Sequence, residues 1–418
     1  MKALLLNTFD SGGGAAIAAY RLHKGLQAID VDSRMLVQLK TGDDRSVSGP
    51  PPIWRKGLAM SRPFIDNIPL VLYPERKKII FSPATIPDRV FVRVREYDPD
   101  IVHLHWIAAG FMKVESLKRL KKPIIWTLHD SWAFTGGCHI PFECTRYRQM
   151  CGACPTLAST KENDLSRKIW RRKQRAWKGL NLTVVAPSRW LAECARSSSL
   201  FRDTRVKVIP NGLDIQIFKP IDKSTARNIL SLPQDKKLIL FGAMDSTSDR
   251  NKGFHFLLPV LRMLSEKGWR DRAELVVFGS REPENTPDLG IKARYMGKLN
   301  DEISLAILYS AADLFVLPSI QENLPNTVME ALACGTPCIA FNQGGLPDMI
   351  EHGKNGYLAK PYETNELARG IEWVLEDDER WRGLSQRARK KVEDEFAIEK
   401  VAKRYEDLYK EIISGRPQ

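Results

Sequence analysis

The sequence lacks any long hydrophobic run. None of its 418 residues fall in a stretch that approaches the roughly 20 apolar residues of a membrane-spanning helix. The apolar run Ala3–Leu6 is too short for the core of a signal peptide and has no cleavage region after it. These absences predict a cytoplasmic protein that can touch a membrane only at its surface.

Repeats, low-complexity tracts and recognised nucleic-acid modules are also missing. The glycines Gly12–Gly14 are followed by Ala15–Ile17, so the G-x-G-x-x-G fingerprint of nicotinamide enzymes is absent. The net charge is nevertheless +14, which calls for a polyanionic partner such as nucleic acid, anionic lipid or a phosphorylated substrate. Without a nucleic-acid module, lipid and phosphorylated substrates are the favoured partners.

A basic segment between Lys161 and Lys178 reads KENDLSRKIWRRKQRAWK and contains Trp170 and Trp177. A helix here would place two tryptophans beside a cationic face, as in helices that lie on anionic membranes. The alternative is a solvated surface helix whose tryptophans pack inward. The first interpretation predicts peripheral contact with an anionic membrane, and both stay open at this level.

Cysteine is sparse, with seven residues in all, yet four of them crowd into one short segment. These four are Cys138, Cys144, Cys151 and Cys154. In a reducing cytosol, a cluster that ends in C-x-x-C fits structural zinc ligands better than disulfides. The spacing C-x5-C-x6-C-x2-C is not one of the usual zinc-finger spacings, however. A structural zinc site, disulfides and free thiols are therefore three open interpretations.

Short aliphatic runs alternate with helical segments along most of the chain. In the first half we expect strands at Lys2–Asn7, Ser33–Gln38, Asp100–Trp106, Pro123–His129 and Leu182–Ala186. In the second half we expect them at Lys237–Met244, Ala273–Gly279, Arg294–Met296, Asp313–Pro318, Pro337–Phe341 and Tyr357–Ala359. Continuous apolar runs are typical of parallel strands covered on both faces. Two such series predict an α/β protein with two facing, Rossmann-like, doubly wound domains.

The pattern pauses at Val206–Pro220, where two prolines and an Asn-Gly turn signal occur. We therefore expect domains over residues 1–207 and 208–390, with a C-terminal helix in 391–418 that packs back on the first domain. Ligands of such sheets bind beyond the carboxyl ends of the strands, so a cleft between the domains is the expected site. The proline-rich excursion at 41–87 is expected to determine acceptor specificity.

The stretch Pro318–Pro337 reads PSIQENLPNTVMEALACGTP, with Glu322 in a loop after a strand and Glu330 in the next helix. That helix should begin near Asn326 and Thr327, because both residue types cap helices well and proline fits just before them. Free N–H groups and the positive dipole end would then suit a diphosphate. Glu330 could bind ribose hydroxyls and Glu322 sugar hydroxyls. An isolated pair of this kind would more often be a cap residue and a solvated helix glutamate.

The stretch resembles the E-x7-E motif of glycosyltransferase family 4, which contains retaining enzymes of GT-B architecture. The lead-in Pro318-Ser319 and the tail EALACGTP from Glu330 also match. Asn323-Leu324-Pro325 replaces the Gly-Phe-Gly of many relatives, a variant that some members share. The resemblance covers nearly the whole chain. It implies an acceptor domain at 1–207, a donor domain at 208–390, and transfer of a hexose from a UDP- or GDP-sugar to a saccharide.

The resemblance also implies roles in the first domain. Gly13 and Gly14 match the family's glycine-rich loop, where bare backbone approaches phosphate or acceptor. His129, at the end of an expected strand, matches the active-site histidine near the donor sugar. His105 matches the family's H-x-H position and shares a face with His103, and we expect both to be supporting or packing residues.

In the second domain the resemblance implies a phosphate clamp and a base pocket. Lys252-Gly253 matches the family's Lys-Gly, but Gly242-Ala243-Met244 stands where relatives have Gly-Arg-Leu, so the usual arginine is missing. Arg250 is the candidate replacement, or else belongs to a solvated loop. The implied catalytic residues are His129, Glu322 and Lys252. The implied donor-binding residues are Gly13, Gly14, Arg250, Lys252, Lys298, Leu299, Glu322, Asn323, Leu324, Asn326, Thr327 and Glu330.

The implied mechanism is transfer with retention, in which Lys252 and a helix N-terminus stabilise the leaving diphosphate. It requires no cofactor, so zinc at the cysteines would be structural. A nucleotide-sugar epimerase and a catalytically silent GT-B subunit are the alternatives. The acceptor is not specified by these motifs. The basic tryptophan segment and the absence of a membrane span favour a lipid-linked saccharide in surface polysaccharide biosynthesis.

Overall fold

The protein is described by a computed structural model that covers the chain except residues 51–52, 243–248, 283–287, 300 and 416–418. The chain divides into two compact units. Unit 1 contains Met1–Gly212 and Glu399–Gln418, and unit 2 contains Leu213–Ile398. Among the described residues, no helix is long and apolar enough to cross a membrane.

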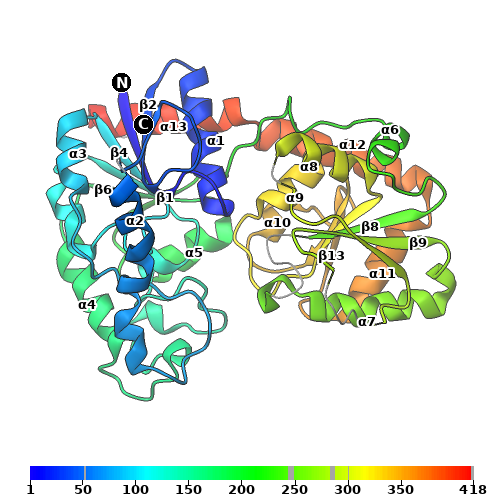
Figure 1. Cartoon of the computed structure of the whole chain (residues 1–418), viewed down its shortest axis with the longest axis horizontal. Coiled ribbons are helices and arrows are strands. Elements are labelled where there is room, and N and C mark those ends of the chain that lie inside the picture. The colour runs from blue at the N-terminus through cyan, green and yellow to red at the C-terminus, as the bar shows by residue number, and fades with distance from the viewer. Residues whose placement is uncertain (51–52, 243–248, 283–287, 300, 416–418) are drawn as a thin grey trace. The chain divides into compact units, whose positions relative to one another are not determined.

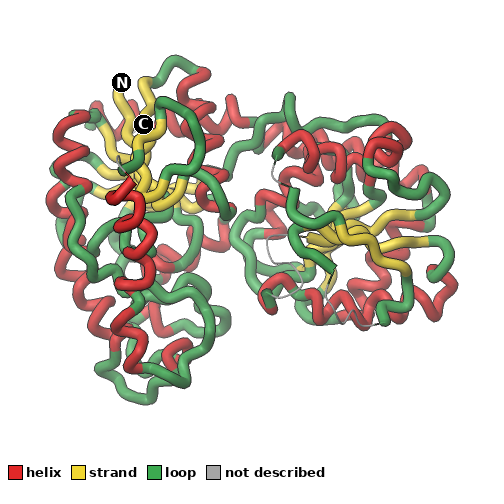
Figure 2. The backbone as a smooth tube through the Cα atoms, viewed as in Figure 1, coloured by secondary structure: helices red, strands yellow, loops and turns green. Residues whose placement is uncertain are grey.

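Unit 1 is built on a parallel sheet of seven strands in the order β3-β2-β1-β4-β5-β6-β7. The strands are β1 (Lys2–Phe9), β2 (Asp32–Leu39), β3 (Val47–Ser48), β4 (Ile101–Leu104), β5 (Ile124–Thr127), β6 (Leu182–Ala186) and β7 (Arg205–Val208). The four residues of β4 and the four of β5 are all buried, because helices cover both faces of the sheet. Figure 2 shows the strands in the interior with helices around them.

The connections of unit 1 contain α-helices (Figure 1) and short 3-10 segments. The helices are α1 (Gly14–Ala28), α2 (Ile53–Asp66), α3 (Val90–Tyr97), α4 (Leu165–Trp177), α5 (Arg189–Ser197) and α13 (Ile398–Ser414). The 3-10 segments are η1 (Ile68–Leu72), η2 (Val114–Arg119), η3 (Trp132–Phe134), η4 (Arg146–Arg148) and η5 (Pro155–Leu157). The excursion at 41–87 thus contains β3, α2 and η1.

The last helix, α13, belongs to the core of unit 1. Tyr405 and Tyr409 are almost fully buried against the N-terminal strands, in one cluster with Ala3 and Leu5. The Tyr405 hydroxyl shares a 2.8 Å hydrogen bond with the hydroxyl of Thr127 at the end of β5. The helix α13 therefore packs against β1 and is hydrogen-bonded to β5.

Unit 2 has a parallel six-stranded sheet in the order β10-β9-β8-β11-β12-β13. Its strands are β8 (Lys237–Gly242), β9 (Ala273–Phe278), β10 (Lys292–Tyr295), β11 (Leu314–Leu317), β12 (Cys338–Phe341) and β13 (Gly356–Ala359). The helical segments are α6 (Lys223–Ile229), η6 (Arg250–Lys252), α7 (Phe254–Leu264), η7 (Ser265–Trp269), α8 (Glu302–Ala311), α9 (Asn326–Ala333), α10 (Leu346–Met349), α11 (Thr364–Leu375) and α12 (Asp378–Glu395). Two doubly wound parallel-sheet domains are therefore confirmed.

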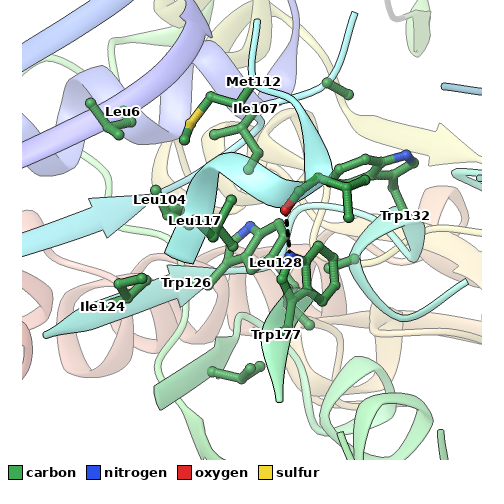
Figure 3. Close-up of a cluster of buried hydrophobic side chains, with 14 of the residues drawn as sticks. Leu6, Leu104, Ile107, Met112, Leu117, Ile124, Trp126, Leu128, Trp132 and Trp177 are labelled. Atoms are coloured by element: carbon green, nitrogen blue, oxygen red, sulfur yellow. Dashed lines mark hydrogen bonds between the residues drawn. The ribbon is translucent and has the colours of Figure 1, made fainter. Parts of the chain in front are cut away.

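A cluster of tryptophans fills the core beneath α4 (Figure 3). Trp177 packs edge-on against Trp126 at 5.2 Å between ring centroids, and Trp132 lies 6.0 Å from Trp126. The Trp177 indole N–H donates to the Val114 carbonyl at 2.9 Å, and Trp170 is only 3% exposed. The interpretation of 161–178 as a membrane-interface helix is therefore wrong, because both tryptophans face the core and only the cationic side is solvated.

Candidate functional site

The predicted donor residues of unit 2 gather where β11 ends. The loop after Leu317 contains Glu322, and α9 begins at Asn326 as the sequence predicts. The cap position is held by Pro325, however, and no side chain caps the helix, so capping by Asn326 or Thr327 is wrong. The first turn of α9 therefore has backbone N–H groups that no capping side chain covers.

Lys252 and Glu322 form an ion pair in this loop region. The Lys252 ammonium donates to Glu322 Oε1 at 2.7 Å, and the two side chains are only 22% and 13% exposed. Burial lowers the pKa of Lys252, but the carboxylate of Glu322 outweighs this effect through attraction and hydrogen bonding, with Asp249 adding to it, so the pKa is raised. Lys252 is consequently a fixed positive charge at physiological pH.

The neighbouring residue Asn251 ties η6 to the Glu322 loop. Its amide donates to the Gln321 carbonyl at 3.0 Å and its side-chain oxygen accepts from the Gln321 N–H at 3.1 Å. Gly253 follows with a left-handed φ of 78°, and a Cβ there would stand 1.8 Å from the Pro318 carbonyl oxygen. Only glycine fits this approach, which holds Lys252 against the end of β11.

Glu330 is buried in the second half of α9, with 4% of its surface exposed. The hydroxyl of Tyr309 on α8 donates to Glu330 Oε2 at 3.1 Å. Burial, followed by the charge of Glu330, raises the pKa of Tyr309 well above its usual value, which keeps the phenol protonated as a donor. The pair orients the second glutamate of the E-x7-E motif from behind.

The other predicted donor-binding residues differ in their exposure to solvent. Arg250 and Lys298 are exposed, and Leu299 is partly buried near the end of β10. Leu324 is 5% exposed and packs in the core of unit 2, so only its backbone could reach a ligand. Asn323 and Thr327 keep partial exposure beside Glu322. Ala243 and Met244, at the position of the missing arginine, lie outside the described residues.

In unit 1, bare backbone leads into α1. Gly12 and Gly13 have left-handed φ values of 77° and 92°, and a Cβ on either would meet nothing within 4 Å. Gly13 is the N-cap of α1, and no side chain caps it. Asp10, just before the glycines, is fixed by accepting N–H groups of Thr41 and Gly42 at 2.8–3.0 Å. The predicted loop is thus an open, backbone-only surface at a helix start.

His129 lies beyond the end of β5 in a ladder of imidazoles. Its Nε2 shares a 3.0 Å hydrogen bond with Nδ1 of His105, and the rings stack at 5.2 Å. The ring of His103 lies tilted against that of His105, 4.3 Å away, and His103 hydrogen-bonds to Thr127 and to Tyr409 of α13 at 2.7 and 2.6 Å. Burial lowers the pKa of His129 to about 4 although Asp130 opposes the shift, and the imidazole is therefore neutral at pH 7.

Comparison with known proteins decides the family. Residues 12–217 match Glycosyltransferase Family 4, and residues 222–391 match Glycosyl transferases group 1, so that together the matches span both units. The chain belongs to glycosyltransferase family 4. The family predicted from the E-x7-E stretch and its GT-B architecture are confirmed.

Curated relatives of this chain differ in the molecules that their names give. It is 26% identical to D-inositol 3-phosphate glycosyltransferase of Corynebacterium aurimucosum over 78% of its own length and 74% of that enzyme. N-acetyl-alpha-D-glucosaminyl L-malate synthase of Bacillus anthracis is 36% identical over 28% of this chain. Three relatives that are 28–36% identical are matched over only 30–59% of their own length. The matched parts leave the acceptor of this chain undefined.

Solved structures show the same fold at low identity. Sucrose-phosphate synthase from Thermosynechococcus elongatus superimposes with a TM-score of 0.71 at 19% identity, covering 99% of this chain and all of that one. HepE of Anabaena, solved in complex with UDP-glucose, gives 0.63 at 17% identity over 98% and 99% of the two chains. At these identities the structural similarity establishes only the fold of this chain.

Several residues that organise the site of the glycosyltransferase were not predicted. Asp130 accepts from the Trp106 indole at 2.7 Å and from His139 at 2.6 Å, and His139 in turn bonds to Ser82 at 2.9 Å. Only the adjacency of Asp130 to His129 gave a signal for this network. Asn251 and Tyr309 gave none, because neither lies at a distinctive spacing from the residue it supports.

The four clustered cysteines lie in unit 1, on the loop between β5 and α4. Cys138 and Cys154 are buried, Cys144 and Cys151 are partly buried, and all four are free thiols in this structure. No group of three or more His, Cys, Asp or Glu side chains among the described residues is arranged to hold a metal ion. These thiols belong to unit 1, and the donor-site residues Lys252, Glu322 and Glu330 belong to unit 2.

Proposed function

We propose that this glycosyltransferase moves a hexose from a nucleotide-sugar donor to a saccharide acceptor with retention at the anomeric carbon. The observation behind the proposal is the partly buried Lys252–Glu322 pair beside the start of α9, which no side chain caps. A diphosphate needs positive charge and N–H donors, and both occur here. Glu322 and Glu330 supply acceptors for hydroxyl groups of the sugar and the ribose.

The chemistry follows from where charge develops. As the bond from the anomeric carbon to the diphosphate breaks, negative charge grows on the leaving phosphate oxygen. Lys252, held charged by Glu322, stabilises that charge without reorganisation, which is the largest contribution in many enzymes. The acceptor hydroxyl attacks from the same face and gives its proton to the departing oxygen, so no metal is required for the step.

The phosphate clamp is completed by Arg250 in this proposal. Arg250 is the exposed first residue of η6, two positions before Lys252. Because η6 is anchored to the Glu322 loop through Asn251, the guanidinium has a fixed base from which to reach a phosphate. The UDP-glucose complex of HepE supports a nucleotide sugar as the donor class. The choice of nucleotide base and of sugar depends on residues other than Arg250 and Lys252.

The acceptor is proposed to be lipid-linked, because unit 1 exposes an apolar surface. Eight of the 17 large hydrophobic side chains exposed in the described part of the chain fall between residues 58 and 80. These eight, here called the α2–η1 surface, are Leu58, Met60, Phe64, Ile65, Ile68, Val71, Leu72 and Ile80. Exposed apolar side chains this concentrated mark an interaction surface.

Charge on the α2–η1 surface favours an anionic membrane as its partner. Val71 and Leu72 are 77% and 81% exposed, and the basic run Arg76, Lys77 and Lys78 follows them closely in the chain. Apolar side chains that enter the headgroup region, flanked by cations, are the combination that binds anionic bilayers. Peripheral contact of this kind would present a lipid-linked saccharide to the enzyme in surface polysaccharide assembly.

Nucleotide binding tests the proposal first. The purified protein is heated with UDP, GDP, their common hexose conjugates, and ATP as a control, and its melting temperature is measured. Either the uridine compounds or the guanosine compounds should raise the melting temperature by a few degrees at millimolar concentration, since only the bound nucleotide stabilises the folded state. No shift with any nucleotide sugar would contradict the proposal. Isomerisation of the donor without acceptor would instead identify an epimerase.

A further inference from the structure

The loop between β5 and α4 is buried although it has little regular structure. Residues 128–164 contain only the short 3-10 segments η3, η4 and η5. Yet Trp132, Phe134, Tyr147 and Leu157 are each at most 5% exposed. Long irregular segments lose a large conformational entropy on ordering, so a buried one needs strong fixed points.

All four clustered cysteines line one small cavity inside this loop. Its wall includes Cys138, Cys144, Cys151 and Cys154, with Phe81, Tyr147 and Arg146 among the other lining residues. The cavity holds about 10 Å³, close to the room that a single water molecule or small ion occupies. The folded loop thus brings four sulfur-bearing side chains to one ion-sized space.

The backbone around the C-x-x-C turn is shaped to present sulfur. Cys151, Gly152 and Ala153 have three successive left-handed φ values of 49°, 104° and 42°. A Cβ on Gly152 would stand 2.4 Å from the Glu162 carbonyl oxygen, so the turn is pressed against the chain that leads into α4. The N–H of Gly136 donates to Cys151 Sγ at 3.2 Å, and the Cys154 N–H is fixed by Asp164 at 2.8 Å.

We propose that Cys138, Cys144, Cys151 and Cys154 bind one zinc ion that holds the loop between β5 and α4 in place. Four sulfur ligands at one small cavity match the tetrahedral, all-cysteine ligand set of structural zinc. All four positions are then filled by protein, which leaves none for a substrate. The ion is therefore structural, and all four of its ligands belong to unit 1.

Binding requires a change in the thiols. In the present side-chain orientations no group of three or more ligating side chains among the described residues is ready to hold a metal, so the sulfurs must turn inward as they lose their protons. Four thiolates around Zn²⁺ leave a net charge of about −2. Arg146 lines the cavity, and the buried Lys173 on α4 interacts electrostatically with Cys151 and Cys138, so positive charge is at hand.

Metal content and thiol counting test the proposal on the full-length protein. The protein is purified without chelator and its zinc is measured by mass spectrometry. We expect about one zinc per chain, released together with four additional reactive thiols when a chelator and an organomercurial are added. Removal of zinc should lower the melting temperature by roughly 5 °C or more, as a loss of a few kcal/mol does.

Variants separate the four ligands from the other cysteines. Cys151→Ser and Cys154→Ser should each lose most of the zinc, whereas the matched control Cys194→Ser, whose cysteine does not line the cavity, should keep it. Wild-type protein with less than about a tenth of an equivalent of zinc after growth in zinc-supplemented medium would overturn the proposal. Disulfides among these four cysteines, found by mass spectrometry without reductant, would overturn it as well. If the variants fail to fold, the wild-type zinc and thiol counts still decide.

Discussion

At the scale of single residues, protonation of the histidines is set by burial. His103 is fully buried, and burial together with the charge of His129 lowers its pKa to about 3. Burial likewise lowers the pKa of His129 to about 4. Both rings therefore act as neutral hydrogen-bonding groups at pH 7, each with one donor and one acceptor nitrogen. A role of His129 beside the donor sugar would accordingly be that of a neutral imidazole.

Stability should fall on mild acidification. The folded pKa values of these histidines lie below the unfolded value of about 6.5, so the unfolded chain binds protons first as the pH drops. Their contribution is complete above pH 6.5 and is lost as the pH falls towards 4. We expect the urea-unfolding free energy to decrease between pH 7.5 and pH 5 by roughly 1 to 2 kcal/mol per buried histidine.

Two variants test this pH dependence, one at a buried histidine and one at an exposed histidine. His103→Asn should reduce the dependence of stability on pH, whereas His352→Asn, at an exposed histidine, should leave it unchanged. A stability that is constant from pH 7.5 to pH 5 in the wild type would show that the histidines are not held neutral by burial.

Residues of the site were predictable where a motif fixes their spacing. Glu322 and Glu330 follow from the E-x7-E pattern, and Lys252 from its glycine neighbour, so the proximity of Lys252 to Glu322 is consistent with those assignments. Tyr309, which hydrogen-bonds to Glu330, lies on another helix at no characteristic spacing. Such partners depend on how helices pack, which sequence patterns do not specify.

At the scale of elements, continuous apolar runs predicted most of the strands. β6 was predicted at its observed bounds, and β1, β8 and β9 to within a few residues. β7 (Arg205–Val208) was missed, because RVKV is the edge strand and its residues are mostly exposed, so no apolar run marks it. The α2 helix was missed because proline-rich sequence surrounds it and because Pro63 lies inside it, where proline usually argues against a helix.

The α2–η1 surface gives a prediction for membrane binding. The double variant Val71→Ser/Leu72→Ser removes two of its most exposed apolar side chains. Its affinity for vesicles of phosphatidylcholine and phosphatidylglycerol should fall about tenfold or more, since each buried aliphatic side chain contributes about 1.5–3 kcal/mol. Cosedimentation with vesicles measures the loss, and the melting temperature should stay unchanged.

The matched control is Val92→Ser on α3, which replaces an exposed valine outside the α2–η1 surface and should bind vesicles like the wild type. Failure of the wild type to bind anionic vesicles would contradict membrane contact. A dimer that dissociates in the Val71→Ser/Leu72→Ser variant, seen by analytical ultracentrifugation, would assign the surface to a second copy of the protein instead.

At the scale of the whole molecule, the candidate functional residues are distributed over both parallel-sheet units. Unit 2 contains Lys252, Glu322 and Glu330, and unit 1 contains the glycine loop, the histidine ladder and the α2–η1 surface. The net charge of +14 suits both a diphosphate donor and an anionic membrane. The fold could be predicted because βα alternation extends over the whole chain. The acceptor could not, because the irregular segments that shape an acceptor site follow no periodic pattern.

In the proposed mechanism Lys252 stabilises the leaving diphosphate. The decisive measurement is kcat/KM for release of the nucleotide from the nucleotide sugar that raises the melting temperature of the protein. It is compared between the wild type, Lys252→Ala and Lys267→Ala. Lys267 pairs with Glu372 at 2.6 Å on the exposed surface of the same unit and serves as the control. We predict a loss of about 10²-fold or more for Lys252→Ala and a rate near wild type for Lys267→Ala. A folded Lys252→Ala protein with a rate within about twofold of wild type would contradict the proposed mechanism.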